Sequence, residues 1–281
     1  MNPMQKNIML LLAVMFLPGV IQLRAQSVSI VAAENFYGGV AAQVAGSSAK
    51  VTSIMSNPNQ DPHEFQTDAA TAKAVANADI VIYSGIGYDD WMEKLIDAQA
   101  KSGRVVIKVS DLIGAKDGEN PHIWYNPKTM PALVAKLAVV FNKPEAVTKF
   151  AHSMKPLLDK IARLQSKSAG VKVTATEPIF GSMATALGFE TLNDPFQVAV
   201  MNDTEPSFIQ TAAFEKSLTT KTVKILFYNS QVINPTTKRM QELARDNGVS
   251  VVGVTETQPA DMKNYVQWML SQLEVVESVL K

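Results

Sequence analysis

Short apolar runs alternate with helical patterns along most of the chain. Runs typical of strands lie at residues 28–33, 50–55, 78–83 and 104–109, and later at residues 171–176, 223–228 and 251–255. Stretches such as residues 69–77 and 90–102 lie between them and have helical spacing. Alternation of this kind predicts right-handed βαβ units, in which helices cover both faces of a parallel sheet. The pattern therefore predicts an α/β fold.

One stretch departs from this alternation. From residue 143 to about residue 167, apolar side chains recur every three or four positions, at Val147, Phe150, Met154, Leu157, Leu158, Ile161 and Leu164. This spacing predicts a long helix, in which Pro144 suits the first turn and Pro156 predicts a kink or a break. We expect two lobes, at residues 26–142 and 171–281, joined by a connecting helix at residues 143–170.

The amino terminus has the pattern of a secretory signal. Lys6 supplies a positive charge, residues 8–23 are almost wholly apolar, and Ala25 is a small residue at the expected cleavage point. No later run approaches the roughly 20 apolar residues that span a bilayer. We therefore expect residues 1–25 to be removed and the mature protein to be exported.

Charge and cysteine content narrow the possible partners and compartments. The 26 basic and 26 acidic residues balance, without a block of one sign, so the sequence does not favour nucleic acid as a partner. Cysteine is absent, which excludes disulfides, thiolate ligands and the cysteine that carries the lipid of bacterial lipoproteins. We expect a periplasmic monomer that is not a lipoprotein.

Two of the three histidines lie in matching settings, Asp61-Pro62-His63 and Asn120-Pro121-His122. The proline before each ring restricts the backbone and keeps the preceding residue extended. A single Pro-His pair is usually structural or exposed, but the repetition favours one shared role, and metal binding is the leading candidate. His152 lies in the long helix, away from its apolar stripe, and we interpret it as solvated.

Two carboxylates follow predicted strands. Glu177 comes after the strand at 171–176, and Glu256 comes after the strand at 251–255. Open parallel sheets bind ligands beyond the carboxyl ends of their strands, so both side chains are candidate ligands. Two ordinary alternatives stay open: Glu177 could stabilise the start of the following helix through the helix dipole, and Glu256 could be a solvated loop acid.

The loop after the strand at 78–83 carries Gly85 and Gly87, the first two glycines of a dinucleotide-binding fingerprint. Asp90 stands where the third glycine belongs. The fingerprint is therefore incomplete, and the sequence does not predict a nucleotide site.

With these motifs assembled, the chain resembles the solute-binding proteins of zinc and manganese ABC transporters. The matching stretches are residues 33–37, 61–65, 85–92 and 120–124 and the loop that carries Glu177. The resemblance implies two lobes bridged by one long helix, a metal held between them, and delivery to a membrane permease.

The resemblance also implies four metal ligands, which fall on His63, His122, Glu177 and Glu256. Many zinc-binding members carry a third histidine at the position of Glu177, and the fourth ligand is commonly an aspartate where this chain has Glu256. Zinc members often have a histidine-rich loop before the second histidine motif, and the corresponding residues 114–119 contain no histidine.

The donor set bears on the choice of metal. Two neutral imidazoles and two carboxylates would balance the charge of one divalent cation. Imidazole favours zinc, and carboxylates shift the preference toward manganese, although intrinsic affinity places zinc well above manganese. We expect Zn²⁺ as the cargo, with Mn²⁺ as the next candidate.

Two other classes of function compete with transport. A secreted zinc-dependent hydrolase could use His63, His122 and Glu177 as ligands and Glu256 as general base. The sequence lacks the HExxH helix and the aspartate-rich pattern of two-metal enzymes, so we do not expect an enzyme. In a surface adhesin, the histidines would be incidental.

Overall fold

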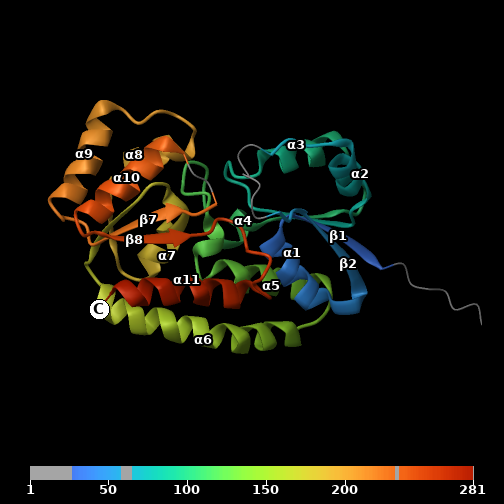
Figure 1. Ribbon diagram of the computed structural model, residues 1–281. Coiled ribbons are helices and arrows are strands. Elements are labelled where there is room, and N and C mark those ends of the chain that lie inside the picture. Colours follow the sequence, from blue (N-terminus) through green and yellow to red (C-terminus); the bar gives the residue numbers. More distant parts are fainter. Residues whose placement is uncertain (1–26, 58–64, 232–233, 281) are drawn as a thin grey trace, which may run out of the picture.

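A computed structural model describes residues 27–57, 65–231 and 234–280. The expected signal peptide and His63 lie outside these ranges. The described chain forms two lobes that lie side by side above one long helix (Figure 1). Each lobe is a four-stranded parallel sheet flanked by helices, as the alternation of apolar runs predicted.

The sheet of the first lobe has the strand order β2-β1-β3-β4. Its strands are β1 (Val28–Glu34), β2 (Ala49–Met55), β3 (Ile80–Tyr83) and β4 (Val105–Lys108). The helices are α1 (Asn35–Ala45), α2 (Ala69–Asn77), α3 (Asp90–Ala98), α4 (Val109–Ile113) and α5 (Thr129–Val140), with single turns η1 (Gly46–Ser48) and η2 (Ile123–Tyr125). Every residue of β3 is buried, which explains why its sequence is apolar without alternation.

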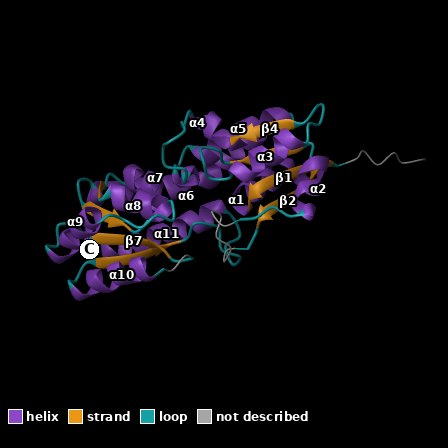
Figure 2. Ribbon diagram, turned by 90° about the horizontal axis from the view of Figure 1, so that it is seen from above, coloured by secondary structure: helices purple, strands orange, loops and turns teal. Residues whose placement is uncertain are grey.

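The second lobe repeats this arrangement with the strand order β6-β5-β7-β8. Its strands are β5 (Lys172–Ala175), β6 (Glu190–Leu192), β7 (Ile225–Asn229) and β8 (Ser250–Val254). The helices are α7 (Gly181–Ala186), α8 (Asp194–Met201), α9 (Phe208–Thr219) and α10 (Pro235–Asp246), and the turn η3 is Pro178–Phe180. The edge strand β6 is absent from the sequence-based prediction because it is short and only partly buried. Figure 2 shows the two groups of strands in separate parts of the molecule.

Two helices run along both lobes. Helix α6 (Glu145–Ser168) is the expected connector, and the last helix, α11 (Tyr265–Val279), lies against it (Figure 1). Helix α6 continues through Pro156, so the sequence-based alternative of a break there is wrong. Pro156 has no N–H group to donate to the carbonyl oxygen of His152, four residues earlier. His152 is exposed, as expected, so water can bind this carbonyl oxygen.

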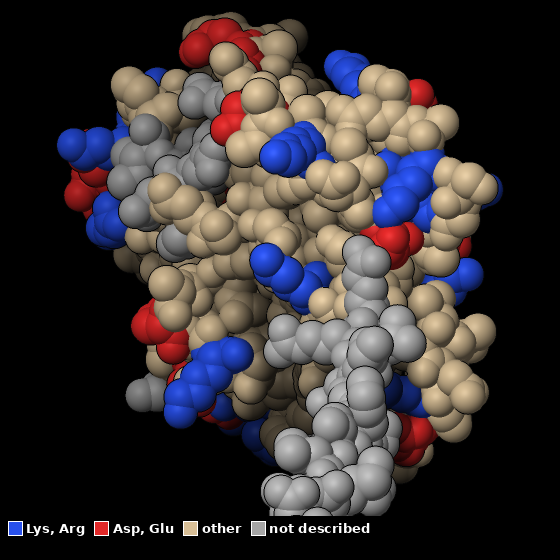
Figure 3. All heavy atoms as spheres, turned by 90° about the vertical axis from the view of Figure 1, so that its right-hand side faces the viewer, with Lys and Arg blue, Asp and Glu red and all other residues tan. Residues whose placement is uncertain are grey.

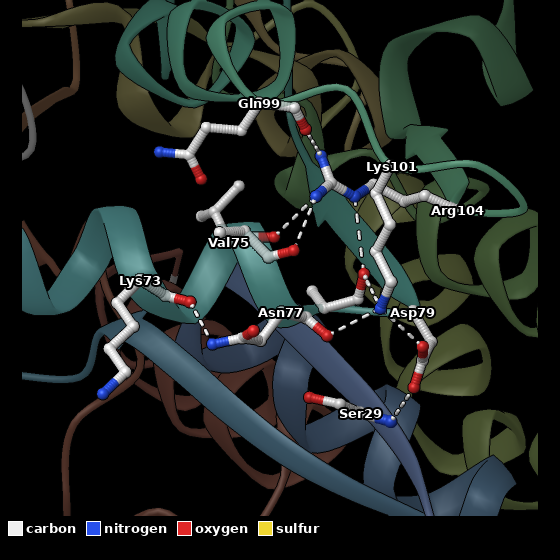
Figure 4. Close-up of polar contacts among 10 residues, drawn as sticks. Ser29, Lys73, Val75, Asn77, Asp79, Gln99, Lys101 and Arg104 are labelled. Carbon is white, nitrogen blue, oxygen red and sulfur yellow. Dashed lines mark hydrogen bonds and ion pairs between the residues drawn. The ribbon is translucent and has the colours of Figure 1, made fainter.

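Two basic residues, Lys101 and Arg104, bind polar groups at the amino-terminal end of the first sheet. Arg104 Nη2 donates to the carbonyl oxygens of Val75 at 2.9 Å and Ala76 at 3.1 Å, at the carboxyl end of α2 (Figure 4). Lys101 Nζ lies 2.7 Å from Asp79 Oδ1, and the other oxygen of Asp79 accepts from the backbone N–H of Ser29. These contacts satisfy helix-end carbonyls and fix α2 relative to β1 and β3.

Aromatic rings connect the two lobes in one continuous core. Phe36 of α1 lies 4.8 Å from Trp124 and 5.6 Å from Trp268 of α11, measured between ring centroids. Tyr125 packs on Trp268 at 5.7 Å and on Phe180 at 5.3 Å. Phe180 in turn stacks on Phe227 of β7 at 4.7 Å. We call these six residues the aromatic row: Phe36, Trp124, Tyr125, Phe180, Phe227 and Trp268.

Charged side chains of both signs are interspersed on the outer face of the first lobe (Figure 3). This distribution agrees with the equal totals of basic and acidic residues in the sequence.

The contact between α6 and the core gives a prediction for stability. Leu157 is fully buried, whereas the next residue, Leu158, is 45% exposed. Leu157→Ala should lower the free energy of unfolding by about 2 to 5 kcal/mol, because it leaves a cavity under both lobes. Leu158→Ala makes the same chemical change on the solvent side and should stay within about 0.5 kcal/mol of the parent. Urea denaturation measures both, and equal losses would contradict the proposed packing.

Candidate metal centre

The carboxyl ends of the two sheets face each other between the lobes. In Figure 1 the arrow of β1 points toward the second lobe, and the arrows of β7 and β8 point toward the first. Polar side chains that follow these strands therefore meet at the boundary between the lobes, as expected for ligand sites in open parallel sheets.

His122 reaches this boundary from the first lobe and is fully buried. It immediately precedes η2, where Trp124 and Tyr125 anchor the chain in the core. Asn120 accepts hydrogen bonds at its Oδ1 atom from the backbone N–H of His122 at 3.1 Å and from the ring Nδ1 at 2.8 Å. Because Nδ1 binds this acceptor, the ring is held with Nε2 directed toward the second lobe.

Glu256 approaches the same point from the second lobe. It follows β8, is 1% exposed, and places its Oε1 atom 3.6 Å from His122 Nε2. Tyr88 donates to Oε1 across the lobes at 3.1 Å, and Asn229 donates to Oε2 at 2.9 Å. Burial, followed by the charge of Glu256, raises the pKa of Tyr88 well above its usual range, so its hydroxyl remains a donor.

The backbone of Glu256 is fixed by side chains from neighbouring elements. Gln231 Oε1 accepts from the backbone N–H groups of Glu256 at 2.7 Å and Thr257 at 2.9 Å. Asn35 donates from the first lobe to the carbonyl oxygen of Gln258 at 2.8 Å. The segment that carries Glu256 is thus held from both lobes, which is incompatible with the alternative of a solvated loop acid.

Glu177 occupies the equivalent position after β5, immediately before η3. Its side chain is largely buried, at 7% exposure. The adjacent Pro178 accepts a hydrogen bond at 2.6 Å from Asn120 Nδ2, so Asn120 ties this loop to the loop of His122. Among residues 27–57, 65–231 and 234–280, however, no three His, Asp or Glu side chains form a metal-binding group.

The structure thus brings together His122 and Glu256 from the four residues singled out in the sequence. Tyr88, Asn229 and Gln231 were missed by sequence reasoning, although they hold Glu256 directly. Asn229 is the last residue of β7, so the rule that ligands bind at strand ends could have found it. Tyr88 lies in residues 85–92, one of the stretches that carry the family resemblance, but the sequence reasoning gave it no role.

A groove between the lobes lies beside the loop that carries His122. It has a volume of about 680 Å³ and is lined by Asn120 and Pro121 from the first lobe and by residues from Pro178 to Asn202 of the second. The loop of His122 is therefore bordered by space that a small solute can enter.

Comparison with known families identifies the family of this chain. Residues 30–279 match the model of the ZnuA family, described as the periplasmic component A of the zinc-uptake complex. The chain belongs to this family. As a member, it is a metal-binding solute-binding protein of ABC transport and not an enzyme.

Curated relatives of this ZnuA-family chain have names that point to several metals. The manganese-binding lipoprotein MntA of Bacillus subtilis is 27% identical over 246 residues, which cover 80% of this chain and 78% of that protein. The iron ABC transporter substrate-binding lipoprotein MtsA of Streptococcus pyogenes serotype M1 is 25% identical over 160 residues, covering 52% and 51%.

Solved structures show the same fold. The periplasmic zinc-binding protein TroA of Treponema pallidum superposes with a TM-score of 0.75 at 16% identity, covering 90% of this chain and 99% of that one. A mutant of the laminin-binding adhesin Lmb of Streptococcus agalactiae gives 0.74 at 19% identity, covering 91% and 100%. Across the described residues of this ZnuA-family chain, every helix is too short or too polar to cross a membrane.

The two bonds from Asn120 to His122 give a prediction for metal binding. Asn120→Ala should weaken metal affinity about 10- to 100-fold, because the ring loses the partner that orients it. Asn126→Ala, on the other side of η2, removes a local bond to the backbone N–H of Lys128 and should leave affinity unchanged. Titration calorimetry with zinc and manganese provides the measurement, and equal affinities for the two variants would contradict the role of Asn120.

Proposed function

We propose that this protein captures one divalent transition metal between its lobes and delivers it to the permease of an ABC importer. The metal ligands in this proposal are His63, His122, Glu177 and Glu256. The observation that carries it is the buried approach of His122 Nε2 to Glu256 Oε1, 3.6 Å apart and contributed by opposite lobes.

The electrostatics of this pair support a cation as the ligand. A buried carboxylate needs compensation, and Tyr88 and Asn229, which both donate to Glu256, are neutral groups. A divalent ion between Glu256 and a neutral His122 would supply positive charge at this carboxylate. With His63 and Glu177 added, the four donors would balance the ion completely.

Zinc is the cargo that we favour, and manganese is the alternative. Imidazole donors and the general order of affinities favour zinc, whereas paired carboxylates suit manganese. The name of the Bacillus subtilis relative supports manganese, and that of the streptococcal relative adds iron as a divalent candidate.

Release of the metal requires the two lobes to loosen where they share it. The aromatic row and helix α6 resist a wide hinge, so we expect the change to be confined mainly to the loops that carry the ligands. The permease would then draw the metal from the groove beside Asn120 without separating the lobes.

We further propose that the protein works as a periplasmic monomer without a lipid anchor or a nucleic-acid partner. The relatives MntA and MtsA are named lipoproteins, but this sequence contains no cysteine to carry a lipid. The same proposal includes cleavage of the signal after residue 25. It also divides the mature chain into lobes at residues 26–142 and 171–281 and a connector at residues 143–170. Mass spectrometry of the exported protein tests the cleavage site and the absence of lipid.

The histidines provide the main test of this function. His63→Ala and His122→Ala should each weaken zinc and manganese binding by orders of magnitude, because each removes a ligand. His152→Ala is the matched control, since this ring is exposed on α6 and should not affect binding. Calorimetric titration of untagged protein, together with metal analysis of the purified sample, provides the measurement. Unchanged affinity in either ligand variant would exclude that histidine from the site.

The carboxylates provide a test of metal preference. Glu177→His adds a third imidazole and should raise the ratio of zinc affinity to manganese affinity. Glu256→Gln removes a negative charge and should weaken both metals. Glu190→Gln is the control for Glu256→Gln, because it makes the same change at an exposed acid of the second lobe. If competition titrations show an unchanged ratio and unchanged affinity, both glutamates are loop residues outside the metal centre.

A further inference from the structure

Two further acids are buried beside the boundary between the lobes. Glu34 is the last residue of β1, and Asp89 immediately precedes α3, and each is 1% exposed. The two side chains interact directly with each other. Neither acid belongs to the proposed set of metal ligands, so their burial calls for a separate explanation.

Asp89 fastens the loop that carries Tyr88. Its two carboxylate oxygens accept hydrogen bonds from the backbone N–H groups of Ser84 at 2.6 Å and Gly85 at 2.7 Å. This loop is conformationally demanding, since Gly85, Ile86 and Gly87 all have positive φ angles, of 80°, 48° and 85°. A non-glycine residue such as Ile86 is strained in this region, so the bonds to Asp89 stabilise a shape that the chain would not otherwise prefer.

Two adjacent buried carboxyl groups cannot both be ionised without a large electrostatic penalty. Burial, followed by the charge of Asp89, raises the pKa of Glu34 well above its usual range. Burial also raises the pKa of Asp89, to about 6, although its two backbone donors oppose that change. One proton held between the two side chains removes this penalty, because only one of the two carboxyl groups then carries a charge. Among the described residues, the other ionisable groups that act on the pair are Tyr37, Tyr83, Tyr88 and Asp90.

Both acids are next to residues that hold the Glu256 segment. Asn35 follows Glu34 and donates across the lobes to the carbonyl oxygen of Gln258. Tyr88 precedes Asp89 and donates to Glu256 Oε1, the oxygen that faces His122. Movement of either acid would therefore displace a donor on which the geometry of Glu256 depends.

We propose that Glu34 and Asp89 share one proton and act as positioning residues that hold Tyr88 and Asn35 in place to orient Glu256 toward the metal. The inference rests on the proposed function, because it takes Glu256 as a ligand. It extends the metal centre to a pair of acids that never contact the ion.

Two variants of Glu34 separate positioning from simple structural support. Glu34→Ala removes the donor and should weaken manganese and zinc binding about 10- to 100-fold. Glu34→Gln keeps an N–H donor toward Asp89 and should restore most of the affinity. Glu93→Gln, a partly exposed acid of the same lobe, is the control and should bind like the parent. Calorimetry well below the melting temperature of each variant measures binding, and circular dichroism verifies folding.

The shared proton has a direct spectroscopic test. The infrared band of an un-ionised carboxylic acid should be present in the parent protein at neutral pH and should be reduced in Glu34→Gln. An infrared band that is absent from the parent, or equally strong in Glu34→Gln, would overturn the inference, and so would parental affinity in a folded Glu34→Ala protein.

Failure of the parent to bind either metal would refute the proposed function itself. Parental binding that His122→Ala abolishes and Glu34→Ala leaves unchanged would refute only the positioning role.

Discussion

The aromatic row is the interaction on which the rest of the structure depends. Its six rings join α1, η2, η3, β7 and α11, so they convert two similar lobes into one packed body. Close-packed interiors resist gradual deformation. A centre at the boundary between the lobes would therefore have a well-defined geometry, because the packed rings hold the lobes together.

Within that frame, His122 and Glu256 are oriented by neutral neighbours. Asn120 binds one side of the imidazole, while Tyr88 and Asn229 each bind one oxygen of the carboxylate. Each partner fixes a direction without adding a charge that would compete with a bound cation. The same residues also join the lobes, since Asn120 bonds the loop of Glu177 and Tyr88 bonds Glu256. The contacts that orient His122 and Glu256 are thus also contacts that hold the two lobes together.

Local sequence patterns were sufficient to predict the two parallel sheets, the connecting helix α6 and the placement of His122 and Glu256 near the boundary between the lobes. These features depend on periodicity, on proline and on the ends of strands, all of which act over a few residues. The contacts of Tyr88 with Glu256 and of Glu34 with Asp89 could not be predicted in this way, because they join segments distant in sequence and depend on tertiary packing. The edge strand β6 was missed for the opposite reason, since three residues, one exposed and two partly buried, give too weak a pattern. His63 lies outside the described residues, so its role remains a prediction from the repeated Pro-His setting.

The position of α11 has a consequence for how the protein matures. Trp268 of this helix donates to Thr255 Oγ1, Gln272 accepts from the backbone N–H of Thr255, and Tyr265 donates to the carbonyl oxygen of Trp124. The last helix of the chain thus secures both the segment before Glu256 and the turn after His122. During synthesis and export, every proposed ligand emerges before α11 does. The bonds from α11 to both segments can form only after this helix has emerged, so a chain that lacks it would carry the proposed ligands without these supports.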